Sequence, residues 1–283
     1  MLLCGRLCRV EPAFPIRTAV AGKPCLLGIP FDEHSSFLRG AAKAPAAIRR
    51  GLYSDSSNLW SENGTDLGCP DSLGDAGDVE FSSDADAFDR IGSSVAGLLE
   101  RGCKPLCLGG DHSVAFPIVK ALRRKYPRLH ILQFDAHPDL YDEFQGNRFS
   151  HACPFARILE AKLTDRLTQV GIRTMNAAQR SQAERFGVQV VEMKDWREGL
   201  RFVSDAPLYV SVDLDVLDPA CAPGVSHCEP GGLTTRQLVA MIQSIQAEIV
   251  GADIVELNPD RDPQGITAMA AAKILKELAA CMQ

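Results

Sequence analysis

Short apolar runs alternate with amphipathic segments along most of the chain. The runs have the length of β-strands, and the segments between them repeat apolar residues at the spacing of one helix face. This alternation predicts a parallel sheet between helical layers. We expect strands at residues 25–30, 105–108, 129–134, 166–172, 188–192, 208–213 and 249–257, and helices at residues 44–52, 85–101, 114–125, 151–161, 177–186, 234–248 and 266–281.

Local signals set several of these boundaries. Pro45 falls in the first turn of its helix, and Gly102 follows the end of the next one, which are the positions these residues favour. Residues 54–80 are irregular and polar, and we expect a long surface connection there. Without a repeat or a low-complexity linker, residues 1–283 are predicted to form a single domain, with residues 1–24 as the candidate for a loosely ordered extension.

Composition and charge exclude several classes of protein. The chain has 283 residues and a net charge of −6, and it has no run rich in lysine and arginine. Binding to nucleic acid or to an anionic membrane is therefore not expected as its main role. Ten scattered cysteines without a CxxC pair predict reduced thiols and a cytoplasmic location. Arg6 and Arg9, with little acid nearby, leave an organelle-targeting segment open.

Aspartates and histidines gather in three motifs, and each motif directly follows a predicted strand. Because the carboxyl ends of parallel strands meet at one edge of a sheet, the three motifs are expected to lie together. Bare carboxylates would repel one another there unless a cation neutralised them. Asp and His without a thiolate suit a divalent metal such as Mn²⁺ better than a structural zinc. The motifs are Gly109–Ser113 (GGDHS), Asp135–Asp139 (DAHPD) and Asp213–Pro219 (DLDVLDP).

The spacing within the motifs selects six candidate metal ligands. Alternate residues of an extended segment share one face, which groups the Asp and His residues of the second and third motifs. Asp218 precedes a proline and is expected in a turn. Any one motif alone is more often a turn or a helix cap; three at strand ends indicate a metal site. Two metals sharing carboxylates would account for so many ligands, and such pairs, about 3.5–4 Å apart, turn water into a nucleophile near neutral pH. The candidates are His112, Asp135, His137, Asp139, Asp213 and Asp215.

With these three motifs in this order, the chain resembles the ureohydrolase family, the arginases and agmatinases. The resemblance is greatest to the branch that holds plant-type arginases and bacterial agmatinases. It implies a three-layer α/β/α sandwich around a mainly parallel sheet, two Mn²⁺ per subunit, and a homo-oligomer, either a trimer or a hexamer. It implies that His112, Asp135, Asp139 and Asp213 hold one Mn²⁺, and that Asp135, His137, Asp213 and Asp215 hold the other. The markers of the branch are residues 35–38 (SSFL), 146–152 (GNRFSHA), 224–227 (GVSH) and 255–259 (VELNP).

The same resemblance assigns the remaining catalytic roles. Glu256 would bind the planar guanidinium of a small cationic substrate, and His151 would carry the proton that the leaving amine needs. On residue type alone, a solvated acid at a strand end is the better interpretation of Glu256. The alternative for His151 is a residue at the start of a helix, beside Ser150 as a plausible N-cap. Asn147 and His227 are weaker candidates for substrate contacts.

Two departures from the animal-type arginases bear on the substrate. Tyr141 and Asn176 stand where those enzymes place residues that hold the α-carboxylate and α-ammonium of arginine. The lost negative charge at Asn176 favours agmatine, cleaved to putrescine and urea. Arginine, cleaved to ornithine and urea, and guanidinobutyrate are the alternatives. A relative without catalytic activity would be expected to have lost a ligand, and a zinc deacetylase would not need His112 and Asp139.

Overall fold

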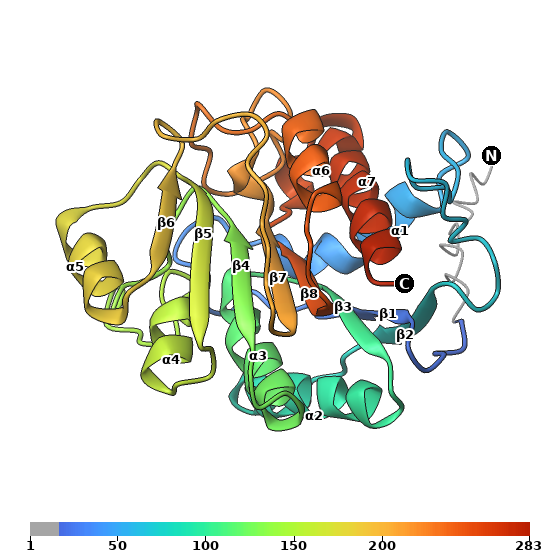
Figure 1. Ribbon diagram of the computed structural model, residues 1–283, viewed down its shortest axis with the longest axis horizontal. Helices are drawn as coiled ribbons and strands as arrows, with labels where there is room; N and C mark the ends of the chain where they lie inside the picture. The colour runs from blue at the N-terminus through green and yellow to red at the C-terminus, as the bar shows by residue number, and fades with distance from the viewer. Residues whose placement is uncertain (1–16) are drawn as a thin grey trace, which may run out of the picture.

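One continuous sheet of eight parallel strands runs through the molecule, and the computed structural model describes it within residues 17–283 (Figure 1). The strands lie side by side in the order β2-β1-β3-β8-β7-β4-β5-β6. In chain order they are β1 (Pro24–Gly28), β2 (Gly74–Asp78), β3 (Lys104–Leu108), β4 (His130–Phe134), β5 (Arg166–Ile172), β6 (Gln189–Glu192), β7 (Leu208–Asp213) and β8 (Ile249–Val255).

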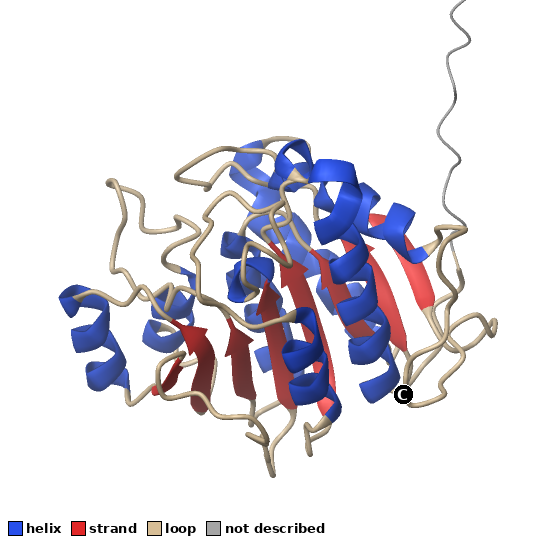
Figure 2. Ribbon diagram, turned by 90° about the horizontal axis from the view of Figure 1, so that it is seen from above, coloured by secondary structure: helices blue, strands red, loops and turns tan. Residues whose placement is uncertain are grey.

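Helices cover both faces of the sheet, as Figures 1 and 2 show. The helices α1, α6 and α7 pack on one face, and α2, α3, α4 and α5 pack on the other, each layer closing its own apolar core. The predicted three-layer sandwich is confirmed. The helices are α1 (Ala44–Leu52), α2 (Ala87–Glu100), α3 (Ala115–Lys125), α4 (Pro154–Glu160), α5 (Ala177–Phe186), α6 (Thr235–Gln243) and α7 (Ile266–Cys281).

The apolar runs form the centre of the sheet because both of their faces are covered. All seven residues of β8 and all six of β7 are buried. A strand that is apolar throughout can occupy only such a position without exposing large hydrophobic side chains to water. The eight cysteines in the described residues are all free, which fits the predicted reduced thiols; Cys4 and Cys8 lie outside those residues, as does most of the predicted extension at 1–24.

Two predictions about elements are wrong. Residues 74–78 form the edge strand β2, although the segment 54–80 was expected to be a surface connection. The sequence GDAGD has no apolar pattern, and β2 is held instead by polar contacts: Arg49 binds the Asp75 carboxylate through Nε and Nη2, each at 2.8 Å. Both groups are buried, so this pair ties β2 to α1.

Helix α6 ends at Gln243, five residues before the predicted end at 248. The Gln246 amide donates to the carbonyl of Phe202 at 2.9 Å, and Val203 and Gln246 form a parallel bridge. The chain therefore leaves the helix to pair with the loop before β7. In the described part of the chain, no helix is both long and apolar enough to cross a membrane.

Candidate metal centre

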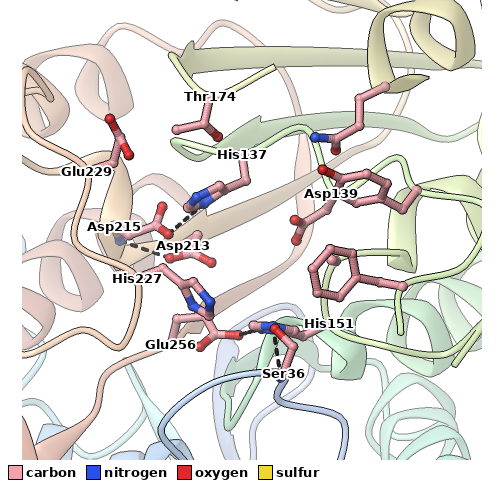
Figure 3. Close-up of a pocket in the computed structure, with 14 residues that line it drawn as sticks. Ser36, His137, Asp139, His151, Thr174, Asp213, Asp215, His227, Glu229 and Glu256 are labelled. Atoms are coloured by element: carbon pink, nitrogen blue, oxygen red, sulfur yellow. Dashed lines mark hydrogen bonds and ion pairs between the residues drawn. The ribbon is translucent and has the colours of Figure 1, made fainter. Parts of the chain in front are cut away.

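The three predicted motifs meet at the carboxyl edge of the sheet, where β3, β4 and β7 end. A cavity of about 270 Å³ opens at this edge, and Figure 3 shows the side chains around it. His137, Asp139, Asp213 and Asp215 line it together with His151, His227 and Glu256. His112 and Asp135 lie buried beneath, within reach of the same side chains.

His112 provides the clearest sign of a missing partner. Its Nδ1 is buried and has no hydrogen bond, yet carboxylate oxygens of Asp135, Asp139 and Asp213 lie 3.0–3.3 Å from it. A buried nitrogen that faces three carboxylates in this way needs either a proton or a cation between them. The donor set of one imidazole and three carboxylates therefore fits a divalent metal.

A hydrogen-bonded chain beneath His112 fixes the orientation of its ring. The Nε2 of His112 lies 2.9 Å from the hydroxyl of Ser211, which donates to Asp253 at 2.7 Å. The Tyr209 hydroxyl donates to the other oxygen of Asp253. A partner on Nε2 leaves Nδ1 to face the carboxylates, which is how protein groups behind a metal ligand usually act.

A second group of ligands lies beside the first and shares Asp135 with it. The Nδ1 of His137 is 2.8 Å from Asp215 and 3.6 Å from Asp135. The sets His112, Asp135, Asp213 and Asp135, His137, Asp215 each place their ligand atoms within 4.8 Å of one another. Two adjacent ions that share a carboxylate fit this arrangement.

Backbone amides hold the carboxylates in place through one oxygen each. The His137 amide donates to Asp135 at 2.6 Å, the Ala136 amide to Asp215 at 3.0 Å, and the Asp215 amide to Asp213 at 2.9 Å. In two of these bonds the turn after a strand folds back onto the carboxylate that begins it. The third, from Ala136 to Asp215, joins the turns after β4 and β7.

Crowding of negative charge perturbs the acids strongly. Burial and the nearby Asp135 raise the pKa of Asp139 to about 6, and burial together with Asp215 and Asp135 raises the pKa of Asp213 well above its usual range. Both effects disfavour the charged carboxylates. A bound cation would remove this penalty, so the electrostatics of the site agree with its geometry.

Two cavity residues have left-handed backbone conformations, which residues other than glycine rarely adopt. The φ angle is 52° at Asp139 and 64° at Glu256. Such conformations cost on the order of 1–3 kcal/mol each and persist only where the surrounding structure enforces them. At Glu256 the amide donates to the carbonyl of Gly110, which turns the end of β8 toward the cavity.

His151 and Glu256 form a buried pair in the wall of the cavity, next to Ser36 (Figure 3). Their Nδ1 and Oε1 atoms are 2.8 Å apart, and the same Oε1 accepts from the His112 amide at 2.8 Å. Burial lowers the pKa of His151, but the Glu256 carboxylate outweighs it and raises that pKa to about 9. The Ser36 amide donates to Nε2 and favours the neutral ring, whereas the Ser36 hydroxyl, 2.8 Å away, can donate or accept. The ring therefore keeps a partner in both protonation states.

The loop that carries Ser36 reaches the cavity across Gly110. A Cβ at Gly110 would lie 1.6 Å from the carbonyl of Phe31, so only glycine permits this approach. Asp111 then accepts from the His34 amide at 3.0 Å and from Ser113. Asp111 therefore ties the loop that carries Ser36 to the turn after β3.

Several polar residues in or near the predicted site do not line the cavity. Asn147 binds His34 through its amide nitrogen and the Phe149 amide through its oxygen, so we withdraw it as a substrate contact. Asn176 caps α5 and donates to the Tyr141 hydroxyl at 2.6 Å. Asp218 accepts from amides of its own loop, as a turn residue does. His130 lies at the opposite end of β4, bound to Ser204.

Other cavity residues were not assigned a role from the sequence. They come from loops whose position depends on tertiary contacts, and no spacing pattern distinguishes them. Ser36 and Ala152 belong to the markers SSFL and GNRFSHA, but the markers gave neither residue a role. The others are Phe144, Thr174, Gln179 and Glu229.

Comparisons with known proteins agree with this geometry. The model of the Arginase family matches residues 23–281. "Arginase 1, mitochondrial" of Arabidopsis thaliana is 45% identical over 272 residues, which cover 90% of this chain and 80% of that protein. The agmatinase of Bacillus subtilis (strain 168) is 32% identical over 288 residues, covering 95% of this chain and 98% of that protein. The solved structure of an arginase from Medicago truncatula aligns with a TM-score of 0.89 at 44% identity, covering 93% of this chain and 88% of that one.

Proposed function

The chain belongs to the arginase family, whose members hydrolyse guanidino compounds, and we propose that its own substrate is arginine, cleaved to ornithine and urea. The observation that carries this choice is the difference in similarity: 45% identity to a protein named arginase, against 32% to one named agmatinase. The preference for agmatine drawn from Tyr141 and Asn176 is therefore replaced by its alternative.

The loss of charge at Asn176 is a weak argument against arginine, because the side chain has a structural task. Asn176 accepts from the Gln179 amide as the N-cap of α5 and does not line the cavity. The residue at position 176 therefore does not indicate whether the substrate carries an α-carboxylate and α-ammonium, as arginine does. Tyr141 does line the cavity, and its hydroxyl, which accepts from Asn176, keeps its own proton available for a carboxylate.

Two Mn²⁺ ions fit the candidate centre. His112, Asp135, Asp139 and Asp213 would hold one, and Asp135, His137, Asp213 and Asp215 the other. When bound, such ions would lower the pKa of a water molecule, so that it can act as a nucleophile near neutral pH.

Glu256 orients the substrate. Its Oε1 is engaged by His151 and the His112 amide, and its Oε2 has no hydrogen bond among the described residues. A planar guanidinium can donate to such an oxygen, which brings its carbon over the acidic residues of the centre. Burial of Glu256 strengthens the interaction, because little water competes for the carboxylate.

The reaction adds one water to the guanidinium carbon and breaks the bond from that carbon to the substituted nitrogen. The leaving nitrogen must gain a proton to depart as an amine, and His151 supplies it. The Glu256 carboxylate holds the imidazole in place, and the Ser36 hydroxyl stays within reach of Nε2 as the proton leaves. The products are urea and ornithine.

Urea release by the Mn²⁺-loaded protein tests this proposal. We expect kcat/KM to be higher for arginine than for agmatine and 4-guanidinobutyrate. A higher value for agmatine would return the proposal to the agmatinase alternative. No urea from any of the three would favour a relative without this activity, although all six candidate ligands are present.

Assembly and location stay predictions. The trimer or hexamer implied by the resemblance awaits a measurement of mass in solution. The predicted cytoplasmic location contrasts with the mitochondrial name of the Arabidopsis relative. Residues 1–16, where a targeting segment was left open, lie outside the described part of the chain.

A further inference from the structure

Glu229 is an acid in the cavity wall that the proposed reaction does not use. The other acidic side chains there have partners: Asp139, Asp213 and Asp215 face the two histidines of the centre, and Glu256 binds His151. The Glu229 carboxylate makes no hydrogen bond or ion pair within residues 17–283, and the side chain is half-buried. An uncommitted carboxylate facing a cavity is available to a cation from the substrate.

The backbone holds Glu229 firmly while its side chain stays free. Arg173 donates to the carbonyl of Glu229 through Nε at 3.0 Å and Nη2 at 2.6 Å. The same Nη2 donates to the carbonyl of Asp215 at 2.7 Å, so one guanidinium joins the Glu229 loop to the metal centre. Asp218 fixes the loop from its other end by accepting from the Gly231 amide at 2.8 Å.

The location of Glu229 differs from that of Glu256. Figure 3 shows Glu229 toward the Asp215 and Thr174 side of the cavity and Glu256 beside His151, with residues of the metal centre between them. A substrate whose guanidinium binds Glu256 therefore meets a second, separate anion in the same cavity. Arginine and agmatine both carry an ammonium at the end opposite the guanidinium, whereas 4-guanidinobutyrate carries only a carboxylate there.

We propose that Glu229 binds the ammonium of the substrate and thereby selects guanidino compounds that carry an amine. This inference rests on the proposed function, since it assumes that the guanidinium occupies the Glu256 side. It also explains how the cavity recognises an ammonium without an acid at position 176, where Asn176 is committed to capping α5.

The test compares Glu229→Gln with wild type on arginine, agmatine and 4-guanidinobutyrate. We expect kcat/KM to fall about tenfold or more for the two amines, mainly through a higher KM, because the lost contact is a charge-assisted hydrogen bond. For 4-guanidinobutyrate it should stay the same or rise, since a repulsive charge has been removed. The control is Glu143→Gln, which removes one exposed charge beside Phe144 at a residue that does not line the cavity.

The pattern across substrates decides the proposal. An equal loss on all three would mean that Glu229 only supports the loop, and no change on any would mean that it faces solvent; either result overturns the inference. If wild type cleaves agmatine better than arginine, the arginase proposal fails, while the contrast between agmatine and 4-guanidinobutyrate still measures the role of Glu229.

Calorimetry separates recognition from turnover. Arginine and 4-guanidinobutyrate are titrated into the Mn²⁺-loaded wild type and Glu229→Gln proteins. A tenfold weaker Kd for arginine alone supports the inference even if no urea is released, a case in which only the proposed function fails. Equal affinities of both proteins for arginine reject it.

Discussion

The two ring nitrogens of His112 have opposite surroundings in the candidate centre. Nε2 binds Ser211, and Nδ1 faces three carboxylates without a hydrogen bond. The ring cannot rotate without losing its bond to Ser211, so Nδ1 is aimed at the metal position before any ion binds. Preorganisation of this kind lowers the cost of binding.

Removal of the Ser211 hydroxyl tests this preorganisation. We expect Ser211→Ala to weaken Mn²⁺ binding about 10–100-fold, because His112 loses the partner that orients it. Calorimetric titration of the metal-free protein with Mn²⁺ measures the change. The matched control is Ser226→Ala, whose hydroxyl is also buried but donates to the carbonyl of Leu38. An unchanged affinity in Ser211→Ala would show that the remaining contacts suffice to orient the ring.

His151 permits a test of proton transfer apart from metal binding. His151→Asn keeps a polar side chain but cannot carry a proton, and we expect kcat to fall about 10²-fold or more with the Mn²⁺ content unchanged. Steady-state kinetics and elemental analysis of the same sample give both values. His130→Asn makes the same exchange at the far end of β4, where no effect on kcat is expected. Loss of metal from His151→Asn would mean that His151 is a ligand.

At the scale of the element, strands were predictable where their residues are apolar. The prediction gave β5, β7, α1, α5 and α7 their observed bounds, because burial against the sheet or the capping residues set those limits. β2 could not be found in this way, since its residues alternate between glycine, alanine and aspartate. Its formation depends on Arg49, which lies 26 residues earlier in the chain than Asp75.

The residues of the candidate site also differ in how far the sequence predicts them. The six candidate ligands lie in motifs directly after strands, so local spacing and sheet geometry together indicate where they meet. Glu229, Gln179 and Thr174 lie in loops or at a helix start, and their access to the cavity depends on contacts such as the one from Arg173 to the Glu229 carbonyl. Such contacts join distant segments, and no periodicity in a single sequence encodes them.

The buried ion pair between Arg49 and Asp75 is expected to contribute to the free energy of unfolding through β2. Replacing Arg49 by methionine leaves the Asp75 carboxylate buried without its counter-ion, and we expect the free energy of unfolding to fall by about 3–5 kcal/mol. Urea denaturation measures this loss. The double variant Arg49→Met, Asp75→Asn should recover part of it, because the uncompensated charge is gone. A single variant within 1 kcal/mol of wild type would mean that water enters the edge and solvates Asp75.

At the scale of the whole molecule, the candidate centre joins segments that are far apart in the chain. Its ligands follow β3, β4 and β7, and the loop with Ser36 and the turn at Glu256 lie against them. The sheet brings these five segments to one edge, although several buried carboxylates there oppose one another. A metal bound at the candidate centre would therefore stabilise the folded state of the whole edge, because the unfolded chain has no comparable site.

Metal removal should consequently lower the thermal stability of the entire protein. A ligand present at a hundredfold its Kd stabilises the folded state by about 2.7 kcal/mol, which corresponds to a shift in Tm of roughly 4–5 °C for a chain of this size. Calorimetric scans of the Mn²⁺-loaded protein, of the protein after chelation, and after Mn²⁺ is restored should show a reversible change. Asp213→Ala removes a carboxylate from both predicted ligand sets, so its Tm should respond little to added Mn²⁺. An equal response in that variant would place the stabilising ion elsewhere on the molecule, because the carboxyl edge would then have lost a ligand shared by both ions without any effect.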